Sequence, residues 1–269
     1  MTIARRPLTI KADDQQLAGA WFGSRTVATS PEIVLLHEGL GSVSMWADFP
    51  AALAKASGMA VFAYDRQGHG GSGRPRLPRP KDWMRHEALA VLPAVLAAQG
   101  IEEPFLFGHS DGATIALIHA AHHPVRGIIS EAAHVFQDDM MLAGAQRATG
   151  QWAHGVLRKK LIEHHGDNAE MLLTGWLDWW RHARRQDWHM IHDLERITCP
   201  VLAIQGSEDA YGTQDQVKKI CASVAGPSQS LFPKGVGHDP HHEVSDHILQ
   251  ETIDWMAKQA VSVSRAKSG

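Results

Sequence analysis

The sequence of 269 residues contains little cysteine and little net charge. Cys199 and Cys221 are its only cysteines, too few for a disulfide framework and in no metal-ligand spacing, so we expect two reduced thiols. The formal net charge of −3 lacks the basic excess that favours binding to nucleic acid or to an anionic membrane surface. We therefore expect a small-molecule substrate, no nucleic acid and no membrane. The oligomeric state is not indicated.

A long hydrophobic run is also lacking. No stretch of about 18 apolar residues, the length of a membrane-spanning helix, occurs in the sequence. Residues 8–19 contain Lys11, Asp13 and Asp14, where a secretory signal would have to be apolar. A cytoplasmic location is therefore expected. The length suits one large domain or a core with a small insertion, rather than two independent large domains.

Short apolar runs alternate with longer segments rich in alanine and leucine. The runs predict strands at 33–36, 59–64, 105–107, 127–129, 201–204 and 229–232, preceded by a hairpin over 8–22. Helices are expected at 51–56, 84–98, 113–121 and 243–258, with a kink at Pro93 and a frayed tail over 261–269. This alternation indicates an α/β fold whose mostly parallel sheet is covered by helices on both faces.

Residues 134–197 interrupt the alternation, because they contain helical patterns and no candidate strand. Five of the nine tryptophans fall in this insertion. Trp152, Trp176 and Trp179 are candidates for lining an apolar pocket that selects a hydrophobic acyl group. The alternative interpretation, that the tryptophans simply pack the insertion, stays open.

Residues 108–112 give the strongest chemical signal. They read Gly-His-Ser-Asp-Gly, a G-x-S-x-G pattern directly after the predicted strand 105–107 and directly before a predicted helix. A nucleophile elbow needs this context, because flanking glycines leave room for a strained turn that projects the serine hydroxyl. Ser110 is the candidate nucleophile.

A serine nucleophile needs a base and an acid that orients the base. The predicted strand 201–204 runs toward Asp209, and a Gly-x-Gly-His loop places His238 shortly before the last helix. We expect Asp209 to orient His238 as the base, with Glu131, which follows the strand 127–129, as the alternative acid. The sequence has no H-E-x-x-H and no other spaced set of metal ligands, so neither a metal nor another cofactor is expected.

An oxyanion hole requires backbone N–H groups aimed at the developing negative charge. One donor is expected from Asp111, the residue after the nucleophile. The other is expected from the loop 37–42, which reads His-Glu-Gly-Leu-Gly-Ser and follows the first predicted parallel strand. Gly39 and Leu40 are the two candidates in this loop.

The loop 37–42, the turn 64–72, the elbow at Ser110, Asp209 and His238 together resemble the α/β-hydrolase superfamily in the order its members share. The resemblance implies an eight-stranded, mostly parallel sheet. It also implies a helical cap at 134–197, between a first core part at 1–133 and a second at 198–269. One departure is Glu38, since family members usually have glycine after the loop histidine. This departure leaves the choice between Gly39 and Leu40 open.

The resemblance implies a serine hydrolase that forms an acyl-enzyme. Similar dehalogenases and epoxide hydrolases have Asp where this chain has Ser110, so a small, hydrophobic carboxylic ester or lactone is the expected substrate. The first alternative is hydrolysis of a carbon–carbon bond in ring-cleavage products. Similar enzymes of that kind usually place an Asn near the oxyanion site, whereas the only Asn here is Asn168, within the insertion. The second alternative is a ligand receptor on the same fold.

Overall fold

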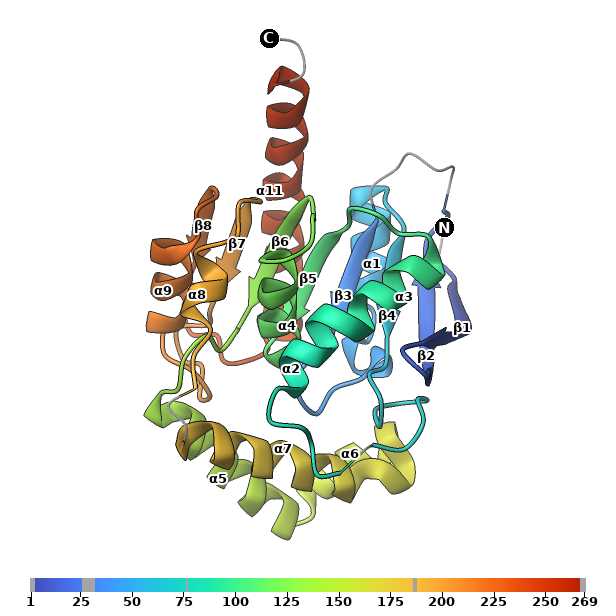
Figure 1. Ribbon diagram of the computed structural model, residues 1–269, viewed down its shortest axis with the longest axis vertical. Coiled ribbons are helices and arrows are strands. Elements are labelled where there is room, and N and C mark those ends of the chain that lie inside the picture. Colours follow the sequence, from blue (N-terminus) through green and yellow to red (C-terminus); the bar gives the residue numbers. More distant parts are fainter. Residues whose placement is uncertain (1–2, 26–31, 76, 186–187, 267–269) are drawn as a thin grey trace.

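A computed structural model describes residues 3–25, 32–75, 77–185 and 188–266, with an eight-stranded sheet at the centre (Figure 1). The strand order is β1-β2-β4-β3-β5-β6-β7-β8. β1 pairs antiparallel with β2 and β2 with β4, whereas every other neighbouring pair is parallel. The expected fold class is confirmed. The strands are β1 (Arg5–Ala12), β2 (Gln15–Phe22), β3 (Ile33–Leu36), β4 (Val61–Tyr64), β5 (Phe105–His109), β6 (Gly127–Glu131), β7 (Val201–Ile204) and β8 (Ser228–Leu231).

The central strands are short and apolar because helices cover both of their faces. Every residue of β3, β4 and β7 is buried, as expected for a parallel strand inside an α/β layer. By contrast, β8 is an edge strand with three exposed residues. The two sides of the sheet carry separate hydrophobic clusters, one around Trp46, Phe49 and Trp255 and the other around Leu92 and Ile115.

Two layers of helices account for these clusters. In Figure 1, α1 and α11 lie behind the sheet, and α3 and α4 lie in front of it. The helices of the core are η1 (Val43–Trp46), α1 (Phe49–Ser57), α2 (Trp83–His86), η2 (Glu87–Val91), α3 (Leu92–Gln99), α4 (Asp111–Ala120), α9 (Asp215–Ser223), α10 (Pro240–Glu243) and α11 (Ser245–Ala266).

The segment around Pro93 bears out the expected irregularity. A π-helical turn, η2, separates α2 from α3 and ends directly before the turn that contains Pro93. Proline has no N–H to donate, and a wider π turn is one way for a helix to absorb that loss.

The segment between β6 and β7 contains α5 (Asp139–Ala153), α6 (Val156–His165), η3 (Gly166–Asn168), α7 (Ala169–Arg185) and α8 (Ile191–Leu194). Figure 1 shows α5, α6 and α7 as a layer below one end of the sheet, the end from which the chain leaves β6. An isolated β-bridge between Phe136 and His189 joins the two ends of this layer. These helices therefore stand over the loops that follow the parallel strands.

The C-terminal helix corrects one expectation. α11 continues to Ala266, whereas the sequence predicted an end near residue 258 and a frayed tail beyond it; residues 267–269 of that tail lie outside the described residues. The sequence contains no glycine or proline between Met256 and Gly269, so nothing in it terminates the helix.

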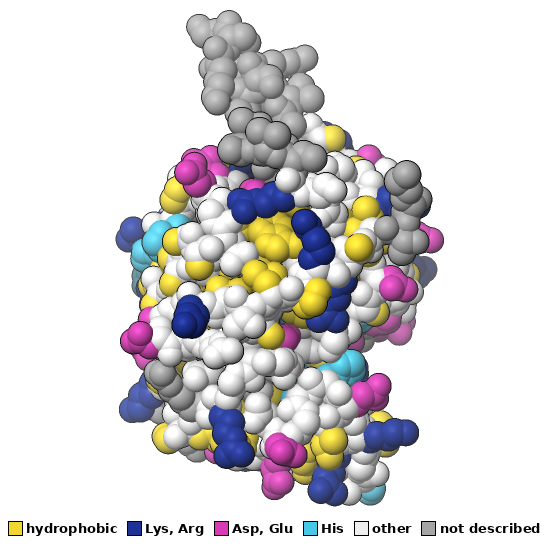
Figure 2. Space-filling model, turned by 90° about the vertical axis from the view of Figure 1, so that its right-hand side faces the viewer, with side chains coloured by type: hydrophobic (Ala, Val, Ile, Leu, Met, Phe, Trp, Pro, Cys, Tyr) yellow, Lys and Arg dark blue, Asp and Glu magenta, His cyan; other side chains and the backbone are white. Residues whose placement is uncertain are grey.

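Over the described residues, no helix is both long enough and apolar enough to cross a membrane. On the face shown in Figure 2, basic and acidic side chains are interspersed.

Candidate active site

Ser110 stands in a sharp turn between β5 and α4. Its backbone has φ 53° and ψ −119°, a strained conformation for a residue with a side chain. Hydrogen bonds on both sides hold the turn, since Ser110 N donates to Glu131 O at 2.8 Å and Ser110 O accepts from Ala113 N at 2.9 Å. The turn therefore has the geometry of a nucleophile elbow.

The two glycines of the elbow have no room for side chains. A Cβ on Gly108 would lie 2.4 Å from Ala113 Cα, and one on Gly112 would lie 2.0 Å from Leu36 O. These distances are far shorter than van der Waals contact. The elbow thus depends on glycine at both positions because strand, helix and the neighbouring strand β3 approach so closely.

The structure brings His238 and Asp209 together from loops that are 29 residues apart. His238 Nδ1 lies 2.8 Å from Asp209 Oδ2 and 3.0 Å from Oδ1, which fits an Nδ1–H that donates to the carboxylate. Asp209 is 4% exposed, and burial alone would raise its pKa. His238 and the N–H of Tyr211 outweigh burial and hold the pKa of Asp209 below its usual value. This pairing leaves Nε2 as the ring nitrogen of His238 that can accept a proton.

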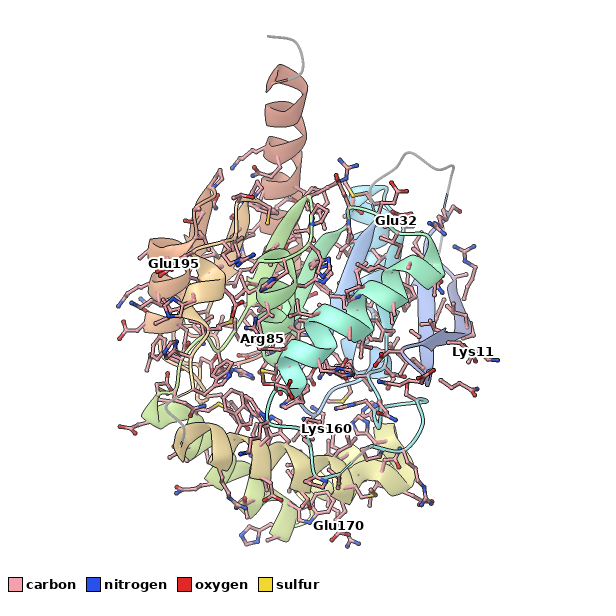
Figure 3. The ribbon with its side chains drawn as sticks, viewed as in Figure 1. Lys11, Glu32, Arg85, Lys160, Glu170 and Glu195 are labelled. Carbon is pink, nitrogen blue, oxygen red and sulfur yellow. The ribbon has the colours of Figure 1, made fainter. Side chains whose placement is uncertain are left out.

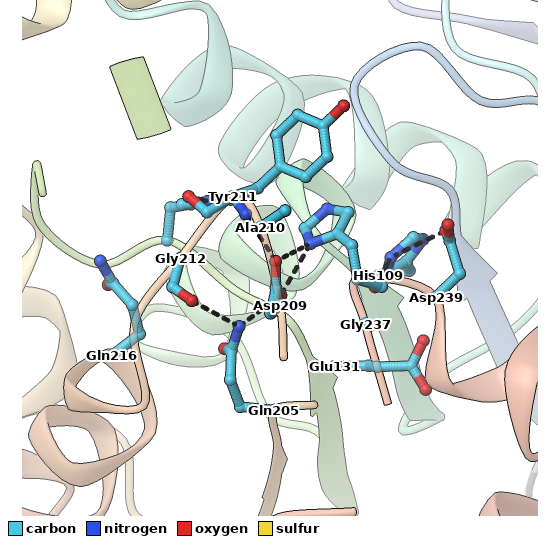
Figure 4. Close-up of polar contacts among 12 residues, drawn as sticks. His109, Glu131, Gln205, Asp209, Ala210, Tyr211, Gly212, Gln216, Gly237 and Asp239 are labelled. Carbon is cyan, nitrogen blue, oxygen red and sulfur yellow. Dashed lines mark hydrogen bonds and ion pairs between the residues drawn. The ribbon is translucent and has the colours of Figure 1, made fainter. Parts of the chain in front are cut away.

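Three further residues support this pair, and sequence patterns did not single them out. Gln205 Nε2 donates to Asp209 Oδ2 and also to Gly212 O, which fixes the carboxylate from below (Figure 4). The ring of Tyr211 packs at a tilt against His238, with 4.7 Å between the ring centroids. His134 is buried beside His238, and burial lowers the pKa of His134 to about 4, so it stays neutral near pH 7.

Ser110 and His238 line one cavity of about 120 Å³ between the core and the helices of the insertion. The core contributes Glu38, Gly39, Leu40, Met45, Ser110, His134, Tyr211, His238 and Asp239, and the insertion contributes Met141, Ala148, Leu157, Lys160, Leu161 and Trp176. Most of these side chains are apolar. Lys160 is the one Lys or Arg among them, and Figure 3 shows it between the insertion helices and the core.

The structure places the three tryptophans that were predicted to line the pocket in different surroundings. Trp176 lines the cavity that holds Ser110. Trp179 instead packs against Trp83 and donates its Nε1–H to Lys81 O, and Trp152 is half-buried beside Arg158. Trp152 and Trp179 are therefore placed away from this cavity. α7 turns Trp176 and Trp179 toward different neighbours, a difference that composition does not reveal.

The predicted oxyanion loop lies against the elbow. Both Gly39 and Leu40 line the Ser110 cavity. Their carbonyl oxygens accept hydrogen bonds from His69 Nε2 and His165 Nε2, whereas their N–H groups have no acceptor among the described residues. Arg66 braces the same loop, because its Nη1 and Nη2 donate to His37 O and Glu38 O. The loop is thus held with two free N–H groups beside Ser110.

Glu38, the departure noted in the sequence, is paired with His109 of the elbow. Glu38 Oε2 lies 3.6 Å from His109 Nδ1, and His109 Nε2 donates to His238 O at 2.9 Å. His109 is fully buried, which alone would lower its pKa, but Glu38, Asp239 and Glu131 raise the pKa to about 10. A Cβ on Gly41 would lie 2.0 Å from Glu38 Oε2, so that glycine makes the space for the carboxylate. A single imidazolium therefore joins the oxyanion loop to the His238 loop.

Glu131 has a different partner from Asp209. His241 Nδ1 makes a very short hydrogen bond with Glu131 Oε1, and both side chains are almost fully buried. His109, Glu131 and His241 are the only described residues that together offer three ligand atoms in metal-ligand spacing, within 4.8 Å of one another. Both ring nitrogens of His109 already face protein partners, because Nε2 donates to His238 O and Nδ1 lies beside Glu38 Oε2. We interpret the group as an ion-pair network behind His238.

Glu38→Gln is expected to lower kcat by roughly tenfold to a hundredfold with little change in KM. Without the Glu38–His109 ion pair the oxyanion loop should shift, and its N–H donors should then stabilise the transition state less. Without the Glu38 charge, the pKa of His109 should fall, so the variant should lose further activity as the pH rises above neutral while the wild type does not. Steady-state kinetics across pH test this. The exposed neighbour of Asp209 supplies the matched control, Glu208→Gln, and an equal loss in that control would contradict the role of Glu38.

Asp111 carries a buried carboxylate directly after the nucleophile. Its side chain is 1% exposed, and neither oxygen has a hydrogen-bond partner among the described residues. Burial raises the pKa of Asp111 to about 6, although Arg66 and Arg79 act against the rise. A Cβ on Gly39 would lie 2.4 Å from Asp111 Oδ2, so the carboxylate lies against the oxyanion loop.

This environment makes Asp111 a source of pH-dependent stability. A carboxyl whose pKa is raised in the folded state stabilises the fold at low pH and loses that contribution as the pH rises through the folded pKa. Relative to wild type, Asp111→Asn should therefore gain about 2.5 kcal/mol in free energy of unfolding between about pH 4 and about pH 8. Urea unfolding at both pH values measures the gain. An equal gain in the exposed Asp215→Asn, or none in Asp111→Asn, would contradict this account.

Comparison with known proteins settles the family. The sequence pattern of the alpha/beta hydrolase family matches residues 33–248, which is more than half of the chain. The chain belongs to the alpha/beta hydrolase family. The expected resemblance is thereby confirmed. A hydrolase of this family is also what the elbow between β5 and α4 indicates.

Individual relatives agree with this assignment. Serine hydrolase BPHL of Homo sapiens is 28% identical over 203 residues, which cover 73% of this chain and 69% of the relative. The solved 2-hydroxy-6-oxo-6-phenylhexa-2,4-dienoate hydrolase (BphD) from Rhodococcus sp. strain RHA1 is similar with a TM-score of 0.79 at 15% identity, covering 94% of this chain and 99% of that one. The enol-lactonase from Burkholderia xenovorans LB400 gives a TM-score of 0.70 at 20% identity, covering 93% of this chain and all of that one. At these identities the two structures share the fold alone with this chain.

Proposed function

We propose that this alpha/beta hydrolase cleaves a small, hydrophobic carboxylic ester or lactone through a Ser110-His238-Asp209 triad. The observation that carries the proposal is the pairing of His238 Nδ1 with both oxygens of buried Asp209, because His238 lines the same cavity as Ser110. This pairing fixes the tautomer whose Nε2 can accept a proton.

In the proposed mechanism, Ser110 Oγ attacks the acyl carbon while His238 Nε2 takes the hydroxyl proton. The backbone N–H of Asp111 and that of Gly39 or Leu40 stabilise the oxyanion, and collapse of the intermediate releases the alcohol, which receives the proton from His238. Water activated by His238 then hydrolyses the acyl-enzyme and regenerates Ser110. Asp209 stays ionised throughout and stabilises the imidazolium. No metal or other cofactor takes part in this mechanism.

The cavity supports the choice of substrate class. Its volume of about 120 Å³ is small beside the 300 to 1,000 Å³ of typical ligand pockets, so a short acyl or alcohol group fits it best. Leu40, Met141, Leu157 and Trp176 give it an apolar lining. A small, largely apolar substrate follows from this combination.

The carbon–carbon hydrolase alternative has less support in this cavity. Asn168 lies in η3 and is not among the cavity residues, so the amide expected near the oxyanion site of such enzymes has no counterpart there. The receptor alternative requires at most a single turnover. Multiple turnovers therefore separate an enzyme from a receptor.

A substrate screen tests the proposal. Wild type and Ser110→Ala are assayed with p-nitrophenyl acetate, butyrate and octanoate, with small lactones and with vinylogous diketones. Repeated turnover of the short esters or lactones by wild type alone would support the proposal. Turnover confined to the diketones would favour the carbon–carbon alternative, and release of at most one product per chain would favour the receptor.

A further inference from the structure

A second cavity, of about 100 Å³, lies beside the active site and shares no lining residue with the Ser110 cavity. Its walls come from β2, from the loop after β4, and from α2 and η2. The lining residues that matter here are Gln15, Arg66, Arg79, Trp83 and Glu87. The proposed hydrolase function leaves this cavity unused.

Each of these five residues has a buried polar atom with no hydrogen-bond partner among the described residues. Three are donors, namely Arg66 Nε, Arg79 Nη1 and Trp83 Nε1, and two are acceptors, namely Gln15 Oε1 and Glu87 Oε2. Four of the side chains are buried, with Arg66 2% and Trp83 6% exposed, and Arg79 is half-buried. An unpaired buried group costs about 1–3 kcal/mol, and such groups in native proteins are nearly always paired with protein or with a bound molecule. Five around one cavity therefore indicate an occupant.

The donors define what kind of occupant fits. The guanidinium of Arg79 lies over the Trp83 ring at 4.6 Å, and that of Arg66 is 6.0 Å from the same ring, so one indole holds two cations side by side. Arg79 forms no ion pair with any carboxylate of the described residues. Burial raises the pKa of Glu87, although Arg66 and Arg79 act against the rise. A planar anion that accepts two or three N–H bonds matches this wall.

We propose that the cavity is a binding site for a small carboxylate. The carboxylate accepts from Arg66 Nε, Arg79 Nη1 and Trp83 Nε1, and a hydroxyl of the ligand, or a water beside it, donates to Glu87 and Gln15. The volume equals that of about three water molecules, which suits an acid of two or three carbons such as acetate or glycolate. Arg66 also braces the oxyanion loop through Nη1 and Nη2, so a ligand on Nε would fix the same guanidinium from its other edge.

Isothermal titration of wild type with acetate, glycolate and chloride tests the site. We expect one acetate or glycolate per chain with a Kd on the order of 1 mM, within reach of so small a ligand, and much weaker chloride binding. Trp83→Phe, which keeps an aromatic ring but removes the pyrrole part of the indole with its N–H, should weaken binding by roughly tenfold, and Arg79→Gln by at least as much. Thermal unfolding checks that each variant is folded.

Lys160→Gln is the matched control, because it removes the one Lys or Arg of the Ser110 cavity and leaves the second cavity intact. It should bind acetate as wild type does. Loss of binding in Lys160→Gln with retention in Trp83→Phe and Arg79→Gln would move the ligand to the Ser110 cavity and overturn the proposal. Absence of binding to wild type, equal binding of chloride, or a crystal structure grown with acetate that shows only water in the cavity would overturn it as well.

Discussion

Ser110→Ala is expected to fold as wild type does and to lose at least about 10³ in kcat, because only the attacking oxygen is removed. No described group hydrogen-bonds to Ser110 Oγ, so its removal leaves no buried partner unpaired. Alanine also keeps the same strained backbone of the elbow. The measurement is kcat on the best short ester from the substrate screen, together with the unfolding midpoint.

The exposed Ser228→Ala on the edge strand β8 is a matched control and should keep wild-type activity. Retention of more than about a tenth of wild-type activity in Ser110→Ala would rule out the serine mechanism, since loss of a triad nucleophile ordinarily costs orders of magnitude.

Asp209→Asn is expected to lower kcat by roughly 10⁴, the loss seen in the serine-protease example for the same acid-to-amide change. The amide can donate to His238 Nδ1 and so favours the wrong tautomer, in which Nε2 carries the proton. The pH dependence of kcat is a second measurement. The lowered pKa of Asp209 keeps its carboxylate ionised beside His238 throughout the neutral range. Neutral asparagine supplies no such charge at any pH.

Glu131→Gln is the matched control for the acid. The structure places Glu131 against His241 rather than His238, so this variant should stay within about tenfold of wild type, a barrier change of roughly 1.4 kcal/mol. If Glu131→Gln were inactive and Asp209→Asn active, the triad would run through β6 and His241 instead.

The elements and the elbow could be predicted because their signals are local. An all-apolar run as short as 33–36 favours a doubly covered strand in this alternation, and the structure places β3 at those residues. The G-x-S-x-G turn carries its own steric reason in Gly108 and Gly112. Boundaries without a local stop signal, such as the end of α11, were predicted less well.

The supporting contacts of the candidate site could not be predicted, because they join distant segments. His109 reaches His238 across 129 residues, and Glu131 reaches His241 across 110. Glu38 stood out only as a departure from the family pattern, and its partner became evident only when the fold placed β5 beside the oxyanion loop. Which tryptophan faces the cavity likewise depends on the packing of α7, not on composition.

Covalent labelling with a fluorophosphonate followed by peptide mass spectrometry tests the central claim most directly. The reagent reacts with a serine only where a base activates the hydroxyl and an oxyanion hole receives the phosphoryl oxygen. We predict one label per chain, on the peptide that contains Ser110, with slow labelling in Asp209→Asn and none in Ser110→Ala. A wild-type protein that hydrolyses esters while Ser110 stays unlabelled, or a label on a different residue, would contradict the assignment of Ser110 as nucleophile.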